Sequence, residues 1–278
     1  SMWDRHTELA VLPADGEFDG LGLRGFAAAA LDELIRLTIN EGKINRNPDS
    51  RMSIDDFSCQ SSGMFVYIES QQTLTISTPT TVSQYQSSNL ILKRAVLVGN
   101  LVVVVSSTDT NDSIETVDSD GKLVLGRIDL LGRIGCMVAI DETSILIGYG
   151  GELLIYSIST GKLKALPTGV PKNGKAFYCV VSANSGEYLA GSKNDGTIVL
   201  IRNREHIVVS TAPSDVEDMH FITKDGKTVA LATCSLNTRS ISLWGINGHF
   251  SIYEELNGHQ VEVTALTSNG QILYSADS

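Results

Sequence analysis

Histidine and cysteine are the residues most often used to bind metals, and the chain has five of the first and four of the second. The cysteines form no Cys-x-x-Cys pair, and no His-Glu-x-x-His segment is present, so the usual spacings of zinc ligands are missing. Three of the cysteines lie in apolar runs, where a thiol behaves as a small hydrophobic side chain. We therefore expect reduced, buried thiols and no bound metal. The residues are His6, His206, His220, His249, His259, Cys59, Cys136, Cys179 and Cys234.

A Gly-x-Gly-x-x-Gly motif at 20–25 precedes a mainly apolar segment, 26–37. A dinucleotide-binding loop has this form, with a following acidic residue such as Glu41 on the ribose. That loop needs a buried strand immediately before it, and residues 15–19 are mainly acidic instead. We therefore predict no nucleotide cofactor. The segment is interpreted as two strands, 21–31 and 34–40, with a short helix over 26–37 as the alternative.

Enzymes that act through serine or carboxylate groups lack their markers in this chain. No Gly-x-Ser-x-Gly segment is present. Residues 192–197 resemble the Asp-box turn of sialidases, but the aromatic residue expected after that turn is missing. Asp195-Gly196 is better explained as a hairpin turn in which the glycine adopts positive φ. The acidic turn at 118–121 lacks EF-hand spacing and is predicted to be a solvated hairpin. We assign no catalytic residue and no cofactor.

The elements that position all of these residues are predicted to be short antiparallel strands. From residue 50 onward, runs rich in β-branched and aromatic residues alternate with Asp-Gly and other glycine turns. One nearly all-apolar strand recurs in each group of strands, and its last six centres are 37–43 residues apart. The seven predicted centres are Leu37, Val66, Val103, Leu146, Leu189, Ala230 and Leu273.

The sharpest motifs are near the two ends of the chain. Gly258-His259 precedes an alternating segment at 261–266, and Trp3-Asp4 is near the first residue. With the repeat of about 40 residues, this pattern resembles the WD40-repeat family, whose four-stranded blades have Gly-His before the first strand and Trp-Asp at the third. The resemblance implies an all-β fold, a seven-bladed β-propeller of four-stranded antiparallel blades. It would form one domain, 1–278, with the last blade shared between residues 2–13 and 259–278.

The resemblance also implies a structural hydrogen-bond set in a blade, made of a histidine, a serine or threonine, an aspartate and a tryptophan. On the closing blade these positions are His259, Ser275, Asp277 and Trp3. The preceding blade has Ser235 and Trp244 but Asn237 in place of the aspartate. The implied role is structural, because buried polar groups that lack partners are costly.

Composition narrows the choice of partners. Lys and Arg number 21 against 32 Asp and Glu, a net charge of −11, which opposes a phosphate backbone. No run of 18 apolar residues is present. We expect no nucleic-acid and no membrane partner, and a location in the cytoplasm or nucleus.

The expected function is a non-enzymatic scaffold that binds a protein or peptide on the loop face of the propeller, within a larger complex or multidomain chain. One alternative is an actin-filament and cofilin-binding disassembly factor, because 231–238 and 263–266 resemble the last repeats of the actin-interacting protein 1 family. Another is a propeller enzyme such as a glycosidase. A pocket of convergent carboxylates and arginines would favour the enzyme, and an exposed aromatic or apolar patch a protein partner.

Overall fold

The computed structural model describes residues 54–59, 64–69, 71–87, 90–171, 175–268 and 272–277, together with the backbone of two two-residue strands, β1 (Ile39–Asn40) and β2 (Lys43–Ile44). Trp3, the strand expected within 2–13, and the strand centre at Leu37 lie outside the described residues.

The described chain is all-β, as predicted, apart from a single 3-10 turn, η1 (Asn184–Gly186). It forms five four-stranded antiparallel sheets and a two-stranded sheet, β23–β24, in addition to β1–β2. The strands of the six larger groups are β3 (Ile54–Cys59), β4 (Phe65–Glu69), β5 (Thr73–Ser77) and β6 (Val82–Gln86); β7 (Ile91–Val98), β8 (Leu101–Ser107), β9 (Asp112–Asp118) and β10 (Leu123–Leu130); β11 (Ile134–Asp141), β12 (Ser144–Tyr149), β13 (Glu152–Ser157) and β14 (Lys162–Leu166); β15 (Phe177–Ala183), β16 (Tyr188–Lys193), β17 (Thr197–Arg202) and β18 (His206–Thr211); β19 (Val216–Lys224), β20 (Lys227–Ser235), β21 (Ser240–Gly245) and β22 (Ile252–Asn257); and β23 (Val263–Ser268) and β24 (Leu273–Asp277).

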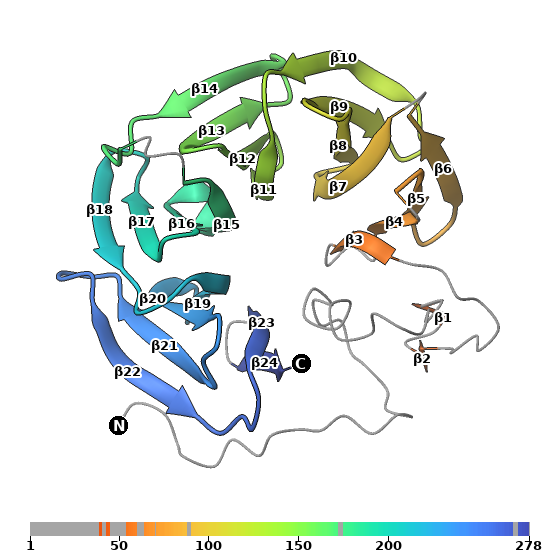
Figure 1. The fold of residues 1–278 in the computed structure, drawn as a ribbon. Helices are drawn as coiled ribbons and strands as arrows, with labels where there is room; N and C mark the ends of the chain where they lie inside the picture. The colour runs from red at the N-terminus through yellow and green to blue at the C-terminus, as the bar shows by residue number, and fades with distance from the viewer. Residues whose placement is uncertain are drawn as a thin grey trace.

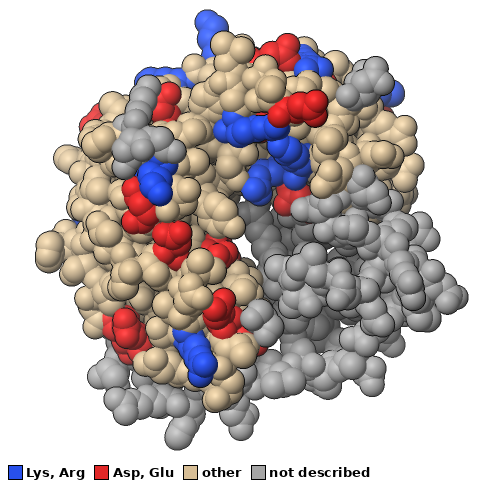
Figure 2. Space-filling view, in the orientation of Figure 1, with Lys and Arg blue, Asp and Glu red and all other residues tan. Residues whose placement is uncertain are grey.

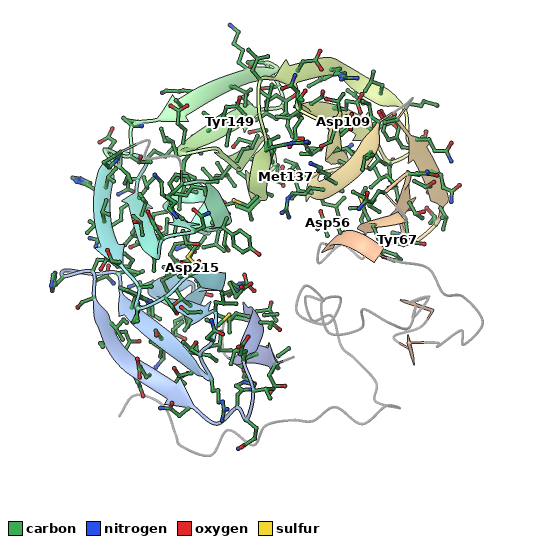
Figure 3. The ribbon with its side chains drawn as sticks, in the orientation of Figure 1. Asp56, Tyr67, Asp109, Met137, Tyr149 and Asp215 are labelled. Carbon is green, nitrogen blue, oxygen red and sulfur yellow. The ribbon has the colours of Figure 1, made fainter. Side chains whose placement is uncertain are left out.

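These sheets stand side by side around a central opening (Figure 1). Within each sheet the strands follow chain order, and the first strand lies innermost. Each inner strand contacts the inner strand of the next sheet, from β3 to β7, β11, β15, β19 and β23. Figure 3 shows Asp56 on β3 and Met137 on β11 beside the opening. This arrangement is propeller-like.

The second strand of each four-stranded sheet is mainly apolar because both of its faces are covered. In β8, Val102 and Val104 pack in one cluster with residues of the β3–β6 sheet, including Val66. Val103 and Val105 point the other way, into a cluster with Ile145 and other residues of the β11–β14 sheet. Neither sheet alone could bury both sets. The predicted centres from Val66 to Leu273 all fall in second strands, which confirms this part of the repeat.

Glycines allow the β11–β14 and β15–β18 sheets to approach each other around Phe177. A Cβ atom on Gly135 would lie 2.2 Å from the carbonyl oxygen of Phe177, and one on Gly148 of β12 would lie 2.8 Å from the Cβ atom of Phe177. Phe177 itself is fully buried. Larger residues at these two glycines would therefore force the sheets apart.

The two acidic turns are hairpins, as predicted. Asp195-Gly196 joins β16 to β17, and Gly196 has a φ of 78°. In the turn from β9 to β10, the Asp118 carboxylate accepts hydrogen bonds from the N–H groups of Asp120 and Lys122, at 3.0 and 2.8 Å. The carboxylate of Asp118 therefore stabilises its own turn.

The outer strands differ in how they end each sheet. β10 pairs with β9 through two register shifts, and β22 pairs with β21 through one. β14 carries Lys162 and Lys164, both exposed. β6 and β18 contain no Lys, Arg, Asp or Glu, and pair with their neighbours without a shift.

Candidate functional site

Each of the six inner strands has a β-bulge near its first residues. The register shifts fall between Leu92 and Arg94 in β7, between Phe177 and Cys179 in β15, and at matching points in the other four. The inserted residues are Asp55, Lys93, Gly135, Tyr178, Glu217 and Thr264. Bulges re-aim side chains and recur next to functional sites. The central opening between the inner strands is the channel, and its end nearest these bulges is the channel mouth. We call this end, together with the turns and sheet-to-sheet connections around it, the bulge face.

Hydrogen bonds between neighbouring sheets hold the bulge face in place. The Leu92 N–H donates to the carbonyl oxygen of Gln71 at 2.8 Å, and the Phe177 N–H donates to that of Gly150 at 2.8 Å. Directly after the bulge of β19, the Asp218 carboxylate accepts a hydrogen bond from the N–H of Leu266 on β23, at 2.8 Å. The positions of the bulged residues are therefore fixed by two sheets at once.

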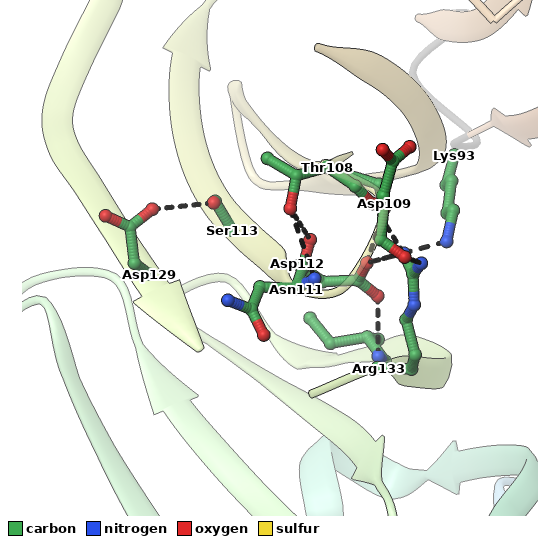
Figure 4. Close-up of polar contacts among 10 residues, drawn as sticks. Lys93, Thr108, Asp109, Asn111, Asp112, Ser113, Asp129 and Arg133 are labelled. Atoms are coloured by element: carbon green, nitrogen blue, oxygen red, sulfur yellow. Dashed lines mark hydrogen bonds and ion pairs between the residues drawn. The ribbon is translucent and has the colours of Figure 1, made fainter. Parts of the chain in front are cut away.

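A buried carboxylate anchors the junction between the β7–β10 and β11–β14 sheets (Figure 4). The side chain of Asp112 is fully buried. It accepts hydrogen bonds from the Ser107 hydroxyl, from the Ile134 N–H at 2.7 Å and from Arg133 Nη1 at 3.0 Å, and Lys93 Nζ lies 3.5 Å away. Four donors from three segments thus converge on one side chain.

This environment keeps Asp112 ionised. Burial acts to raise the pKa of Asp112, but the hydrogen bonds from Ser107, Ile134 and Arg133 and the charge of Lys93 outweigh it, so the pKa lies below its ordinary value. The side chains of Lys93 and Arg133 remain 37% and 43% exposed, so both cations also reach the surface.

Charges of both signs surround the channel mouth, and they are unevenly distributed around it (Figure 2). Figure 2 shows Lys and Arg side chains gathered beside the opening over β7 and β11, with a few acidic side chains next to them, and mainly Asp and Glu side chains over β19 and β23. The Lys and Arg residues of these two elements, the basic group, are Lys93 and Arg94 on β7 and Arg133 directly before β11. Glu217 is on β19, and Glu262 directly precedes β23. A partner with complementary charges would be oriented by this uneven distribution.

Tyr178 lies between the two groups of charges. It is 53% exposed. The charge of Glu217 and partial burial raise the pKa of its phenol, while the charge of Arg94 opposes them, so both charged groups act on the ring. The bulge face also carries exposed apolar side chains on its turns and connections. These are Ile91, Leu131, Leu236 and Val261.

Three predicted site residues come together on the β23–β24 hairpin. His259 Nδ1 lies 2.8 Å from Asp277 Oδ2, and His259 Nε2 lies 2.7 Å from Ser275 Oγ. The imidazole is only 6% exposed. Each ring nitrogen therefore has one partner, and the ring joins the connection before β23 to the end of β24.

The tryptophan of the preceding sheet uses a different partner from the predicted one. Trp244 Nε1 donates to Thr233 Oγ1 at 3.0 Å, and not to Ser235. Leu231 pairs with Trp244 across β20 and β21, so Thr233 is the diagonal neighbour on the same face and Ser235 is two residues further away. Ser235 instead offers its carbonyl oxygen to the Thr238 hydroxyl at 2.7 Å.

Replacing His259 by alanine is expected to lower the free energy of unfolding by about 1–2 kcal/mol, because Asp277 and Ser275 each lose a buried hydrogen-bond partner. Thermal and urea unfolding measure the change. His206 to alanine is the control, since His206 is exposed on β18. Equal unfolding of the two variants would contradict a stabilising role for His259.

The three cysteines whose side chains the structure describes are suited to packing and not to nucleophilic chemistry. Cys136, Cys179 and Cys234 are free thiols. Burial raises the pKa of Cys136 and of Cys234 to about 12, which leaves both as neutral thiols at neutral pH. In the part of the chain that the structure describes, no three His, Cys, Asp or Glu residues are placed to hold a metal ion. The same part has no helix long and apolar enough to cross a membrane.

Sequence reasoning missed Asp112 and Arg94. Asp112 had one signal, its place in a polar segment between two apolar strands, but its donors Arg133 and Ile134 are more than twenty residues away.

No protein-family model matches this chain, and no curated protein matches its sequence.

Proposed function

We propose that this chain is a non-enzymatic scaffold that binds a protein or peptide on its bulge face. The observation that carries the proposal is Tyr178, an aromatic residue 53% exposed at the channel mouth, with charges of both signs beside it. Tyrosine is enriched at protein interfaces, where its ring buries apolar area and its hydroxyl keeps a hydrogen bond.

The scaffold would be a closed seven-bladed WD40-like propeller. Five four-stranded sheets and the two-stranded sheet β23–β24 stand side by side around the opening, and this arrangement supports the proposal. So does the His259, Asp277 and Ser275 set, which occupies the place that the WD40 pattern gives it. Strands from residues 2–13 would complete the last blade and remove its free edge.

A rigid frame favours binding without large rearrangement. The hydrogen bonds between sheets fix the bulged residues, while the connections that surround them vary in length and sequence. Such loops on a rigid scaffold commonly carry binding residues. A partner would meet side chains that are already positioned, which lowers the entropic cost of association.

Two tyrosines with equal exposure provide a matched test. Tyr178 and Tyr253 are both 53% exposed, but Tyr253 is on the outer strand β22. Proteins captured from a cell lysate by the wild-type chain would be identified, and the affinity of the purified partner measured for each variant. Replacing Tyr178 by alanine is expected to weaken binding about tenfold or more, as for a central interface residue. Replacing Tyr253 by alanine should leave it unchanged.

The competing functions give different results in the same assays. Equal binding by both tyrosine variants would move the interface away from the bulge face. Turnover in a glycoside panel, lost when Glu217 is replaced by glutamine, would overturn the non-enzymatic proposal. Co-sedimentation with actin filaments and cofilin would identify the partner class that the resemblance of 231–238 and 263–266 implies.

A further inference from the structure

Arg94 is the one cation of the basic group that is not used to neutralise Asp112. Lys93 and Arg133 both contact that carboxylate. Arg94 follows the bulge of β7 and is partly buried, yet it makes no hydrogen bond or ion pair with any residue that the structure describes. A guanidinium in this position has its full capacity for a bidentate bond to a planar anion.

The acidic side of the mouth is similarly available. Among the described residues, Glu217 and Glu262 make no ion pair and no side-chain hydrogen bond. Glu217 is the bulged residue of β19, and its neighbour in the ring, β15, carries Tyr178. One path across the mouth therefore passes a free cation, an aromatic ring and a free carboxylate.

We infer that the bulge face recognises a dipolar peptide segment, with an Asp or Glu carboxylate on Arg94, an apolar side chain on Tyr178 and a Lys or Arg toward Glu217. The inference rests on the proposed function and names the chemical class of the partner. A carboxylate is favoured over a polyanion, because a nucleic acid crossing the mouth would meet the acidic side and a chain of net charge −11.

Short synthetic peptides test the inference directly. The probe is fluorescein-Gly-Glu-Gly-Leu-Gly-Lys-Gly, compared by fluorescence polarisation with versions in which glutamine replaces the glutamate, the lysine or both. The wild-type chain should bind the dipolar peptide best. Arg94→Gln should lower its affinity about tenfold and should lower it little for the peptide without glutamate. Raising the salt concentration should reduce the difference.

Charge reversal provides the decisive comparison. Arg94→Glu should prefer a peptide with lysine in place of the glutamate, so the preference of the wild-type chain inverts. Arg127→Glu, on the outer strand β10, is the control with the same charge change. Circular dichroism and thermal unfolding verify that each variant is folded.

The outcomes separate this inference from the proposed function. Equal affinity of the dipolar and neutral peptides, or no inversion with Arg94→Glu, overturns it. If the natural partner still loses affinity with Tyr178→Ala, the bulge face remains the binding surface. Tighter binding of a phosphoserine peptide than of the glutamate peptide would overturn it in favour of phosphate recognition.

Discussion

Replacing Asp112 by alanine is expected to lower the free energy of unfolding by about 3–5 kcal/mol. The side chain is fully buried and accepts hydrogen bonds from Ser107, Arg133 and the Ile134 N–H. Its removal leaves these donors unsatisfied and withdraws the only carboxylate that Lys93 and Arg133 contact among the described residues. Urea and thermal unfolding, followed by circular dichroism, measure the loss.

Two further variants separate charge from shape. Asp112→Asn keeps the size of the side chain and one acceptor oxygen, so its loss should be smaller than that of the alanine variant. Asp120→Ala removes an exposed carboxylate that forms a solvent-exposed ion pair with Lys122, and should change stability by no more than about 0.5 kcal/mol. An alanine variant at 112 as stable as the one at 120 would refute this account of the junction.

The pH dependence of stability should report the same carboxylate. The pKa of Asp112 lies below the ordinary value of 3.8, so the unfolded chain takes up this proton before the folded one does. Its contribution is therefore complete above the unfolded pKa and is lost as the pH falls through the folded pKa. The difference in melting temperature between the wild-type chain and Asp112→Asn should be largest at neutral pH and should narrow below about pH 4.

Replacing Trp244 by alanine is expected to cost about 3–5 kcal/mol as well, through a cavity in the core. Trp244 is 1% exposed, its ring centroid lies 5.2 Å from that of Phe250, and both belong to a cluster that joins the β15–β18 and β19–β22 sheets. Chemical unfolding of the variant measures the cost. A loss below about 1 kcal/mol would show that the two sheets repack around the cavity.

The hydrogen bond of Trp244 can be tested separately from its volume. Trp244→Phe keeps most of the aromatic contact but removes the donor that Thr233 accepts. Trp244→Phe should therefore lower the free energy of unfolding by less than Trp244→Ala does. Adding Thr233→Val to Trp244→Phe should then have a smaller effect than Thr233→Val alone, because the two side chains act as a pair. Strict additivity would indicate that the bond contributes nothing to stability.

The repeat could be predicted because a strand covered on both faces must be apolar throughout. Val103 and Leu146 mark such strands and lie in β8 and β12. The bulges could not be predicted, since one extra residue leaves the composition of a strand unchanged. Lys93 and Tyr178 therefore read as ordinary strand residues, although the bulges place them at the channel mouth.

The predicted hydrogen-bond residues show the same limit. The spacing of His259, Ser275 and Asp277 predicted that all three come together at the β23–β24 hairpin, because only a short stretch of chain separates them. The partner of Trp244 depends instead on the register between β20 and β21, which selects Thr233. Arg94 and Asp112 depend on contacts between separate sheets, and no spacing within one repeat indicates them.

The unequal outer strands affect how the molecule resists aggregation. An outermost strand presents unpaired backbone groups on which another chain can add by hydrogen bonding, and lysines, other charges and bulges discourage this addition. β10, β14 and β22 carry such residues or irregularities. β6 and β18 do not, and their exposed Val82 and Val209 add apolar surface to a regular strand edge. Among the outer strands of the five four-stranded sheets, those two are therefore the points at which copies of this chain would most easily add to one another.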